Sequence, residues 1–157
     1  MFAKTFEKFS YTSAGISTFL LLGISYYYTT LDINWSLFES KIINGILIFG
    51  ALMLSNYAID TVTRQLTIER SNRNAYHLLL YPLIVISYPV ESIDMRFILS
   101  SAAIWAAWRN VRIFFEITDN TKKIKRLFDA SVLLSLSSLI IVENLIIFAY
   151  PLLALIT

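Results

Sequence analysis

The sequence predicts an all-helical membrane protein: two long transmembrane helices followed by two helical hairpins, in a single integral membrane domain over residues 1–157. Three observations lead to this prediction. Of the 157 residues, 57% are hydrophobic and only 15% are charged, whereas an ordinary water-soluble domain carries about a quarter charged residues. Long uncharged windows separate the charges, and the mean hydropathy is +0.64. Finally, the basic residues gather on alternate connections.

The first two uncharged windows, Phe9 to Leu31 and Ile42 to Ile59, have the length of spanning helices. A helix rising about 1.5 Å per residue needs roughly 20 apolar residues to cross a hydrocarbon core of about 30 Å. Small and polar residues inside these windows are expected to hydrogen-bond between helices and to let backbones approach closely. They are Ser13, Gly15, Ser17, Ser25, Asn44, Gly45, Gly50 and Asn56.

Four shorter windows follow, in two pairs that predict two helical hairpins. The first pair meets at the polar turn around Glu91 and the second at Glu143. About six apolar helices are therefore expected in all. Each hairpin could cross the membrane fully or enter it and return on the same side. The two hairpins also resemble each other weakly, either through duplication or because any hairpin needs a polar tip. The four windows are Asn74 to Val90, Phe97 to Trp108, Ala130 to Val142 and Asn144 to Thr157.

The boundaries of two of these helices can be refined. The fourth window reaches spanning length if it continues past Arg109 and Arg112 to Phe115, with both guanidinium groups extending toward the headgroups. The stretch from Thr118 to Thr121, with the lysines behind it, is expected to form a solvated loop. Asp129 is expected to stand at the start of the fifth helix, where the helix dipole favours an acidic residue.

The orientation follows from the 13 lysines and arginines. With a cytoplasmic amino terminus, only Lys41 and Arg96 lie outside. This is a strong positive-inside bias, and it predicts that both termini are cytoplasmic. The basic residues on the inner side are Lys4, Lys8, Arg64, Arg70, Arg73, Arg109, Arg112, Lys122, Lys123, Lys125 and Arg126.

The cytoplasmic arginines are the most suggestive chemical group. Guanidinium groups bind phosphate in a bidentate fashion, so they are candidate ligands for a lipid or phosphate headgroup. The alternative explanation is the positive-inside rule itself, with local helix pairs such as Asp60 with Arg64. The five candidates are Arg64, Arg70, Arg73, Arg109 and Arg112.

Glu143 and Asn144 interrupt an apolar stretch that begins at Ala130, and they form a candidate intramembrane polar site. A buried Glu143 would serve a proton or cation pathway, whereas an exposed one would be a turn residue at the hairpin tip.

Other reactive chemistry is not indicated. The chain has no cysteine and one histidine, His77, which we expect at the cytoplasmic interface. No metal site, cofactor or catalytic residue is predicted, and the net charge of +2 does not suggest a partner nucleic acid.

One resemblance adds to this reading. Asn74 to Tyr76, Tyr88 to Glu91, Trp108 to Asn110, a lysine-rich loop and Leu127 to Ser131 follow in an order that resembles the amino-terminal half of an uncharacterised family. Its members are multi-pass inner-membrane proteins of Bacteroidetes-type bacteria, known as a domain of unknown function. The resemblance implies a bacterial inner-membrane location and no activity. It also implies that this chain is either a short relative or part of a longer protein.

The leading functional hypothesis is a non-enzymatic subunit that packs against membrane lipids and other integral membrane proteins in a larger complex. The alternative is a membrane enzyme or transporter for a lipid phosphate, which requires the arginines to converge on one pocket.

Overall fold

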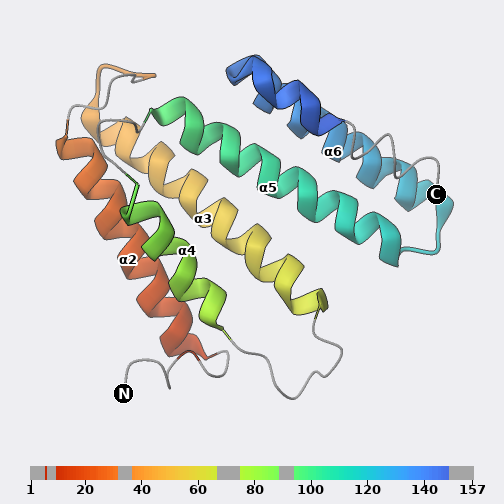
Figure 1. Cartoon of the computed structure of the whole chain (residues 1–157), viewed down its shortest axis with the longest axis horizontal. Coiled ribbons are helices and arrows are strands. Elements are labelled where there is room, and N and C mark those ends of the chain that lie inside the picture. The colour runs from red at the N-terminus through yellow and green to blue at the C-terminus, as the bar shows by residue number, and fades with distance from the viewer. Residues whose placement is uncertain (1–5, 7–9, 32–36, 67–74, 89–93, 149–157) are drawn as a thin grey trace.

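The computed structural model describes residue 6 and residues 10–31, 37–66, 75–88 and 94–148, with the side chains of residues 64–66 and 148 left out (Figure 1). These residues form helices, and no strand occurs among them. The prediction of an all-helical chain is confirmed. The elements are α2 (Tyr11–Thr30), α3 (Lys41–Leu66), α4 (Tyr76–Ile86), α5 (Met95–Glu116), α6 (Asn120–Ile140) and the 3-10 helix η2 (Val142–Phe148).

Successive α-helices run in alternate directions, with α3 near the centre of the bundle (Figure 1). Helices α2 and α4 pack on one side of α3, and α5 packs on the other side with α6 beyond it. As a result, the end of α5 and the start of α6 lie at the opposite end of the bundle from Lys41 and Arg96.

Side-chain caps explain where three helices begin. Ser10 accepts a hydrogen bond from the Ser13 backbone N–H at 3.1 Å, and the Ser13 hydroxyl accepts from the Ser10 N–H at 3.0 Å. This reciprocal capping box satisfies donors at the first turn of α2. Single carboxylates cap the other two helices. Asp94 accepts a hydrogen bond from the Arg96 N–H at the start of α5, and Asp119 accepts one from the Thr121 N–H at the start of α6.

Small polar residues line the contacts between helices. The Asn56 amide donates to the Ser17 hydroxyl at 3.1 Å, and the Ser25 hydroxyl donates to the Gly45 carbonyl at 2.7 Å. A methyl group on Gly45 would lie 3.0 Å from the Thr29 side chain, so α2 and α3 approach closely there. The expected contacts are therefore present at Ser17, Ser25, Gly45 and Asn56, whereas Ser13 bonds within its own helix and a methyl group at Gly15 or Gly50 would have no neighbour within 4 Å.

Asn44 differs from that expectation. Its side chain bonds to the backbone N–H and C=O of Phe38 at 3.1 and 2.7 Å, and so fixes the chain entering α3 instead of bridging to another helix.

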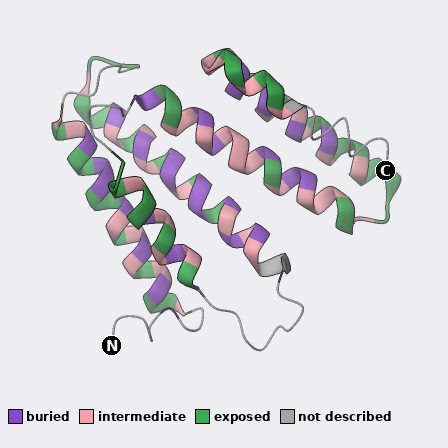
Figure 2. Cartoon of the chain, viewed as in Figure 1, coloured by how far each residue is buried: buried purple, intermediate pink, exposed green. Residues whose placement is uncertain are grey.

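Large apolar side chains, in contrast, cover the outside of the bundle. Phe19 of α2, Ile42 of α3 and Leu139 of α6 are 76%, 76% and 82% exposed, and buried residues form narrow inward stripes (Figure 2). The buried apolar residues include a cluster of Leu21, Ile24, Tyr28, Ile48, Leu52 and Met95 between α2, α3 and the start of α5.

By length and composition, one described helix could cross a membrane: α3, over Lys41–Thr63. Helix α2 has 20 residues, but its tyrosines, serines and threonines lower its hydropathy. Helix α4 is apolar but has only 11 residues. Two long helices were expected to span the membrane. Both α2 and α3 are long enough, but only α3 is also apolar enough.

The first predicted hairpin needs correction. Its two windows form α4 and α5, yet α4 packs mainly on α2 and α3, whereas α5 packs mainly on α6 and α3. Leu78 and Pro82 are the buried residues of α4, and the small face of α5 that includes Ala107 meets Ala130 of α6. The tightly packed antiparallel pair is thus α5 with α6. In the second predicted hairpin, the described part of the sixth window forms η2 and packs on α6.

The start of α6 was also predicted wrongly. The helix begins at Asn120, so the lysines after Thr121 are helical and Asp129 lies inside the helix. The cause is the Asp119 cap, which starts the helix ahead of the apolar window. Charged residues do not stop a helix when one face, here Leu127 and Ala130, stays buried. The extension of α5 past Arg109 and Arg112 is confirmed.

The Asp94 cap yields a stability prediction. Removing it in Asp94→Ala should lower the free energy of unfolding by about 1 kcal/mol at neutral pH, because the first turn of α5 loses its acceptor. Asp94→Asn, which retains an acceptor oxygen, should lose less. Thermal unfolding of the purified protein in detergent measures both, and equal melting of the wild type and Asp94→Ala would contradict the role of the cap.

The same residue predicts a pH dependence. Burial opposes ionisation of Asp94, but the hydrogen bonds and the charge of Arg96 outweigh it and hold the pKa below its ordinary value of 3.8. A carboxylate with a lowered pKa stabilises the fold above the unfolded-state pKa and loses that contribution as the pH falls through the folded-state pKa. The stability difference between the wild type and Asp94→Asn should therefore shrink below about pH 3.8, and melting curves across that range test it.

Candidate functional site

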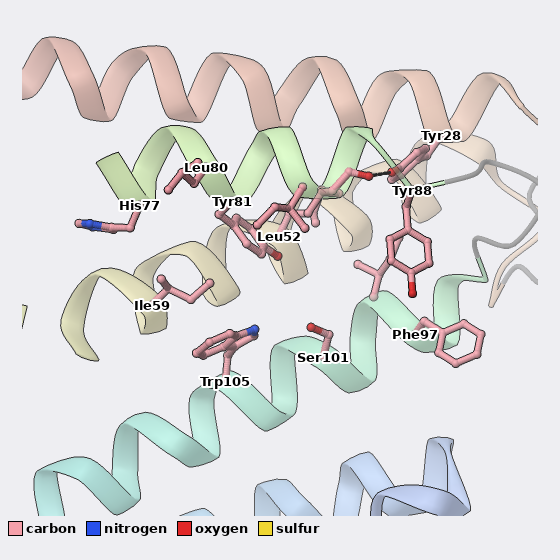
Figure 3. A pocket seen from close by; sticks show the side chains of 13 residues that line it. Tyr28, Leu52, Ile59, His77, Leu80, Tyr81, Tyr88, Phe97, Ser101 and Trp105 are labelled. Carbon is pink, nitrogen blue, oxygen red and sulfur yellow. Dashed lines mark hydrogen bonds between the residues drawn. The ribbon is translucent and has the colours of Figure 1, made fainter. Parts of the chain in front are cut away.

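An apolar groove runs between α4 and α5, with α3 and the end of α2 behind it (Figure 3). Its volume is about 750 Å³, within the range of small-molecule sites. Five aromatic residues contribute to its lining: Tyr28, Tyr81, Tyr88, Phe97 and Trp105. The groove occupies the place where the predicted α4–α5 hairpin contact would have been.

Helix α4 is held at both ends, which keeps the groove open along its length. At its carboxyl end, the Tyr28 hydroxyl donates to the Val85 carbonyl at 2.7 Å (Figure 3). That carbonyl belongs to the last turn of α4, where acceptors lack partners within the helix. At its amino end, the Ala75 N–H donates to the Phe6 carbonyl at 2.8 Å, and Phe6, Ala75 and Leu78 form a buried cluster.

His77 and Asp60 form a second tie at the amino end of α4. His77 Nε2 lies 2.9 Å from Asp60 Oδ1, and the two side chains are 14% and 9% exposed. An ionised carboxylate can only accept, so Nε2 is the donor. His77 also lines the end of the groove. The expected placement of His77 at the cytoplasmic interface stays a prediction, and so does the expected Asp60–Arg64 pair, because the side chain of Arg64 is not described.

The pair could have been found from topology. Asp60 stands near the end of the second window and His77 near the start of the third, and an antiparallel connection brings these two ends together. Sequence spacing within one helix does not reveal such contacts between two helices.

Two of the five candidate arginines have described side chains, Arg109 and Arg112. The Arg109 guanidinium carbon lies 5.0 Å from the centre of the Tyr57 ring, and Nη2 donates weakly to the Tyr57 hydroxyl at 3.4 Å. The Nε atoms of both arginines are buried and lack a hydrogen-bond partner within the part of the chain that is described. The side chain of Arg64 is not described, and Arg70 and Arg73 lie outside the described residues.

Arg109 and Arg112 continue the groove face of α5. Ile98, Ser101 and Trp105 line the groove, and the two arginines follow Trp105 at spacings of four and seven residues. Such spacings place side chains on one face of a helix. Along this face of α5, the side chains change from apolar to positively charged toward the end of the bundle where α4 begins and His77 lies.

Glu143 and Asn144 have separate roles. The Glu143 side chain is exposed, so the burial that a proton or cation pathway requires is not present. Asn144, in contrast, donates to the hydroxyls of Ser100 and Ser137, which lie 2.8 Å from each other. Asn144 thus ties η2 to both α5 and α6, a role that the sequence pattern did not predict.

Within the described residues, no group of three or more histidines and carboxylates could hold a metal ion. Comparison with protein-family models, curated proteins and solved structures gave no match. The family resemblance therefore stays a prediction.

The His77–Asp60 pair gives a test of the amino-terminal tie. A double-mutant cycle with His77→Ala and Asp60→Ala should show a coupling of about 0.5–3 kcal/mol in the free energy of unfolding, as for residues in one buried polar network. The control is the exposed Lys122–Asp119 pair, whose atoms are 3.7 Å apart and whose coupling should stay below about 1 kcal/mol. Equal coupling in the two cycles would contradict a structural tie at His77.

Proposed function

We propose that this chain is a multi-pass domain of a bacterial inner (cytoplasmic) membrane, and that it acts as a non-enzymatic subunit packing against lipids and partner membrane proteins. The observation that carries the proposal is the distribution of polarity, in which serine and asparagine are buried between the helices and many large apolar side chains are exposed. In water this arrangement would be unfavourable, because apolar area would stay hydrated while hydroxyl and amide groups occupied the interior.

The apolar exterior extends around the whole bundle. Each described α-helix turns at least one large apolar side chain outward, including Phe19, Ile46, Ile84, Phe115 and Leu139. Single exposed residues of this kind are ordinary in soluble proteins, whereas coverage of every helix is typical of a surface facing lipid or other membrane helices. Close helix approach at small residues, as at Gly45, fits the same environment.

In this proposal, α2, α3, α5 and α6 cross the membrane, and the short α4 lies at membrane depth beside them. The end of the bundle with Arg112 and the α6 lysines faces the cytoplasm, and the end with Lys41 and Arg96 faces outward. On the outer side, Asp94 neutralises Arg96, with the nearest atoms 2.6 Å apart. This pairing leaves little net positive charge on that side, as the positive-inside rule predicts.

A subunit role is favoured because the described residues hold no reactive constellation, whereas the apolar exterior offers a wide contact surface for other membrane proteins. The alternative, a membrane enzyme or transporter for a lipid phosphate, is favoured by one observation. Among the residues that the structure describes, the buried Nε donors of Arg109 and Arg112 have no partner, as expected for groups that bind an anionic ligand.

The topology can be tested cleanly because the chain has no cysteine. Glu39→Cys and Lys122→Cys place one thiol at exposed positions at opposite ends of the bundle. In intact spheroplasts, a membrane-impermeant maleimide should label the first variant and should label the second only after permeabilisation. Labelling of Lys122→Cys in intact cells would overturn the orientation, and recovery of the protein in the soluble fraction would overturn the membrane assignment.

The subunit role predicts a defined complex. The tagged protein, extracted from native membranes in mild detergent, should elute with a second polypeptide in fixed ratio. A monodisperse single chain with no companion, as judged by mass spectrometry, would contradict the subunit role while leaving the membrane assignment intact.

A further inference from the structure

We infer that the groove between α4 and α5 binds one hydrocarbon chain of an anionic amphiphile, with the charged head at the Arg109 and Arg112 end. This inference rests on the proposed membrane location. It goes beyond a packing role, since it assigns the chain a lipid site of its own.

The groove has room for a hydrocarbon chain. Its volume of about 750 Å³ lies within the range of sites that hold small molecules. An extended hydrocarbon chain is thinner than a helix because it carries no side chains, so it can enter between α4 and α5.

The lining matches a hydrocarbon. Side chains from Leu80, Tyr81, Ile98 and Trp105 present apolar surface, and Ser101 is a small residue that leaves space between them (Figure 3). Apolar cavities do not hold water well and bind apolar molecules instead. Beside a bilayer, the nearest such molecule is a lipid chain entering from the side.

The charged end supplies the direction of binding. Trp105, Arg109 and Arg112 lie on one face of α5, so a chain lying on Trp105 would bring its head to the two guanidinium groups. Their Nε atoms are buried and unpartnered within the described residues, although Arg109 contacts Tyr57 through the ring face and a weak 3.4 Å hydrogen bond from Nη2. A carboxylate or phosphate oxygen would satisfy these donors.

The Asp60 carboxylate is engaged by His77, whose Nε2 lies 2.9 Å from Oδ1. That pair sits on the α3–α4 side of the groove end, whereas the two arginines extend from α5.

Two tryptophans on α5 make the inference testable by fluorescence. Trp105 lines the groove, and Trp108 is 36% exposed on the same helix. Trp35→Phe/Trp108→Phe leaves Trp105 as the reporter, and Trp35→Phe/Trp105→Phe leaves Trp108. The full-length protein in detergent micelles is titrated with stearic acid carrying a nitroxide on its chain. Quenching of Trp105 should saturate near one label per protein, and quenching of Trp108 should rise in proportion to the label in the micelle.

Two outcomes separate the possible failures. Quenching of Trp105 that follows Trp108 without saturation would overturn the groove site and leave the membrane proposal standing. Absence of quenching at both tryptophans would overturn the membrane proposal, and the groove site with it.

Substitutions at Ser101 provide a steric test. Ser101→Leu fills the groove and should abolish the saturable quenching of Trp105, whereas Ser101→Ala should retain it. Retention in a folded Ser101→Leu variant would overturn the site. If Ser101→Leu does not fold, the comparison of Trp105 with Trp108 still decides the question.

Competition by unlabelled compounds tests the head. Stearate and octadecyl phosphate should each displace the label at least about tenfold better than octadecanol, as expected for a charge-assisted hydrogen bond. The stronger of these two competitors shows whether the site prefers a carboxylate or a phosphate head. Arg109→Gln/Arg112→Gln should remove this preference, and the exposed Lys122→Gln should not. Equal competition by octadecanol would overturn the assignment of the charged end.

Discussion

The structure depends on polar groups that pair where the helices meet. Hydrogen bonds between Ser17 and Asn56, and from Ser25 to the Gly45 carbonyl, fix α2 against α3. Ser100 and Ser137 do the same between α5 and α6. Each such bond contributes only about 0.6–2 kcal/mol between membrane helices. Their value lies in selecting one register, since a rotated helix would separate these polar groups from their partners.

Helix α4 packs on α2 and α3 and leaves a groove on its side toward α5. Its polar contacts are made by His77 with Asp60, by the Val85 carbonyl with Tyr28, and in mid-helix by Tyr81 with Ser55. The inward face of α4 is therefore fixed on α2 and α3, and the face toward α5 is left with a cavity of about 750 Å³.

Most helices could be predicted from the sequence, because uncharged windows mark where a helix can form and serines within them mark where two helices can hydrogen-bond. The α4–α5 contact could not. Two apolar windows joined by a short polar turn are compatible with two helices that pack together and with two helices that lie apart. The position of small residues, which allow close packing, decides between these arrangements. Ala107 and Ala130 pack in one cluster between α5 and α6, while Tyr81 and Trp105 line the groove between α4 and α5. The predicted arginine site was similarly incomplete, since charge counting found Arg109 and Arg112 but not the groove that their helix face continues.

The groove and the apolar exterior have a common explanation in the proposed membrane location. A bundle stabilised in lipid does not need to exclude water from a continuous core, so an apolar groove open to its surroundings carries little penalty there, because lipid chains can fill it. In water, the same groove would cost roughly 25 cal/mol for each Å² of apolar surface left hydrated. The groove face of α5 continues into two arginines, which in the proposed orientation lie at the cytoplasmic interface, where anionic headgroups are found. The positive-inside pattern and the proposed lipid site are therefore consistent with each other, since both place guanidinium groups at that interface.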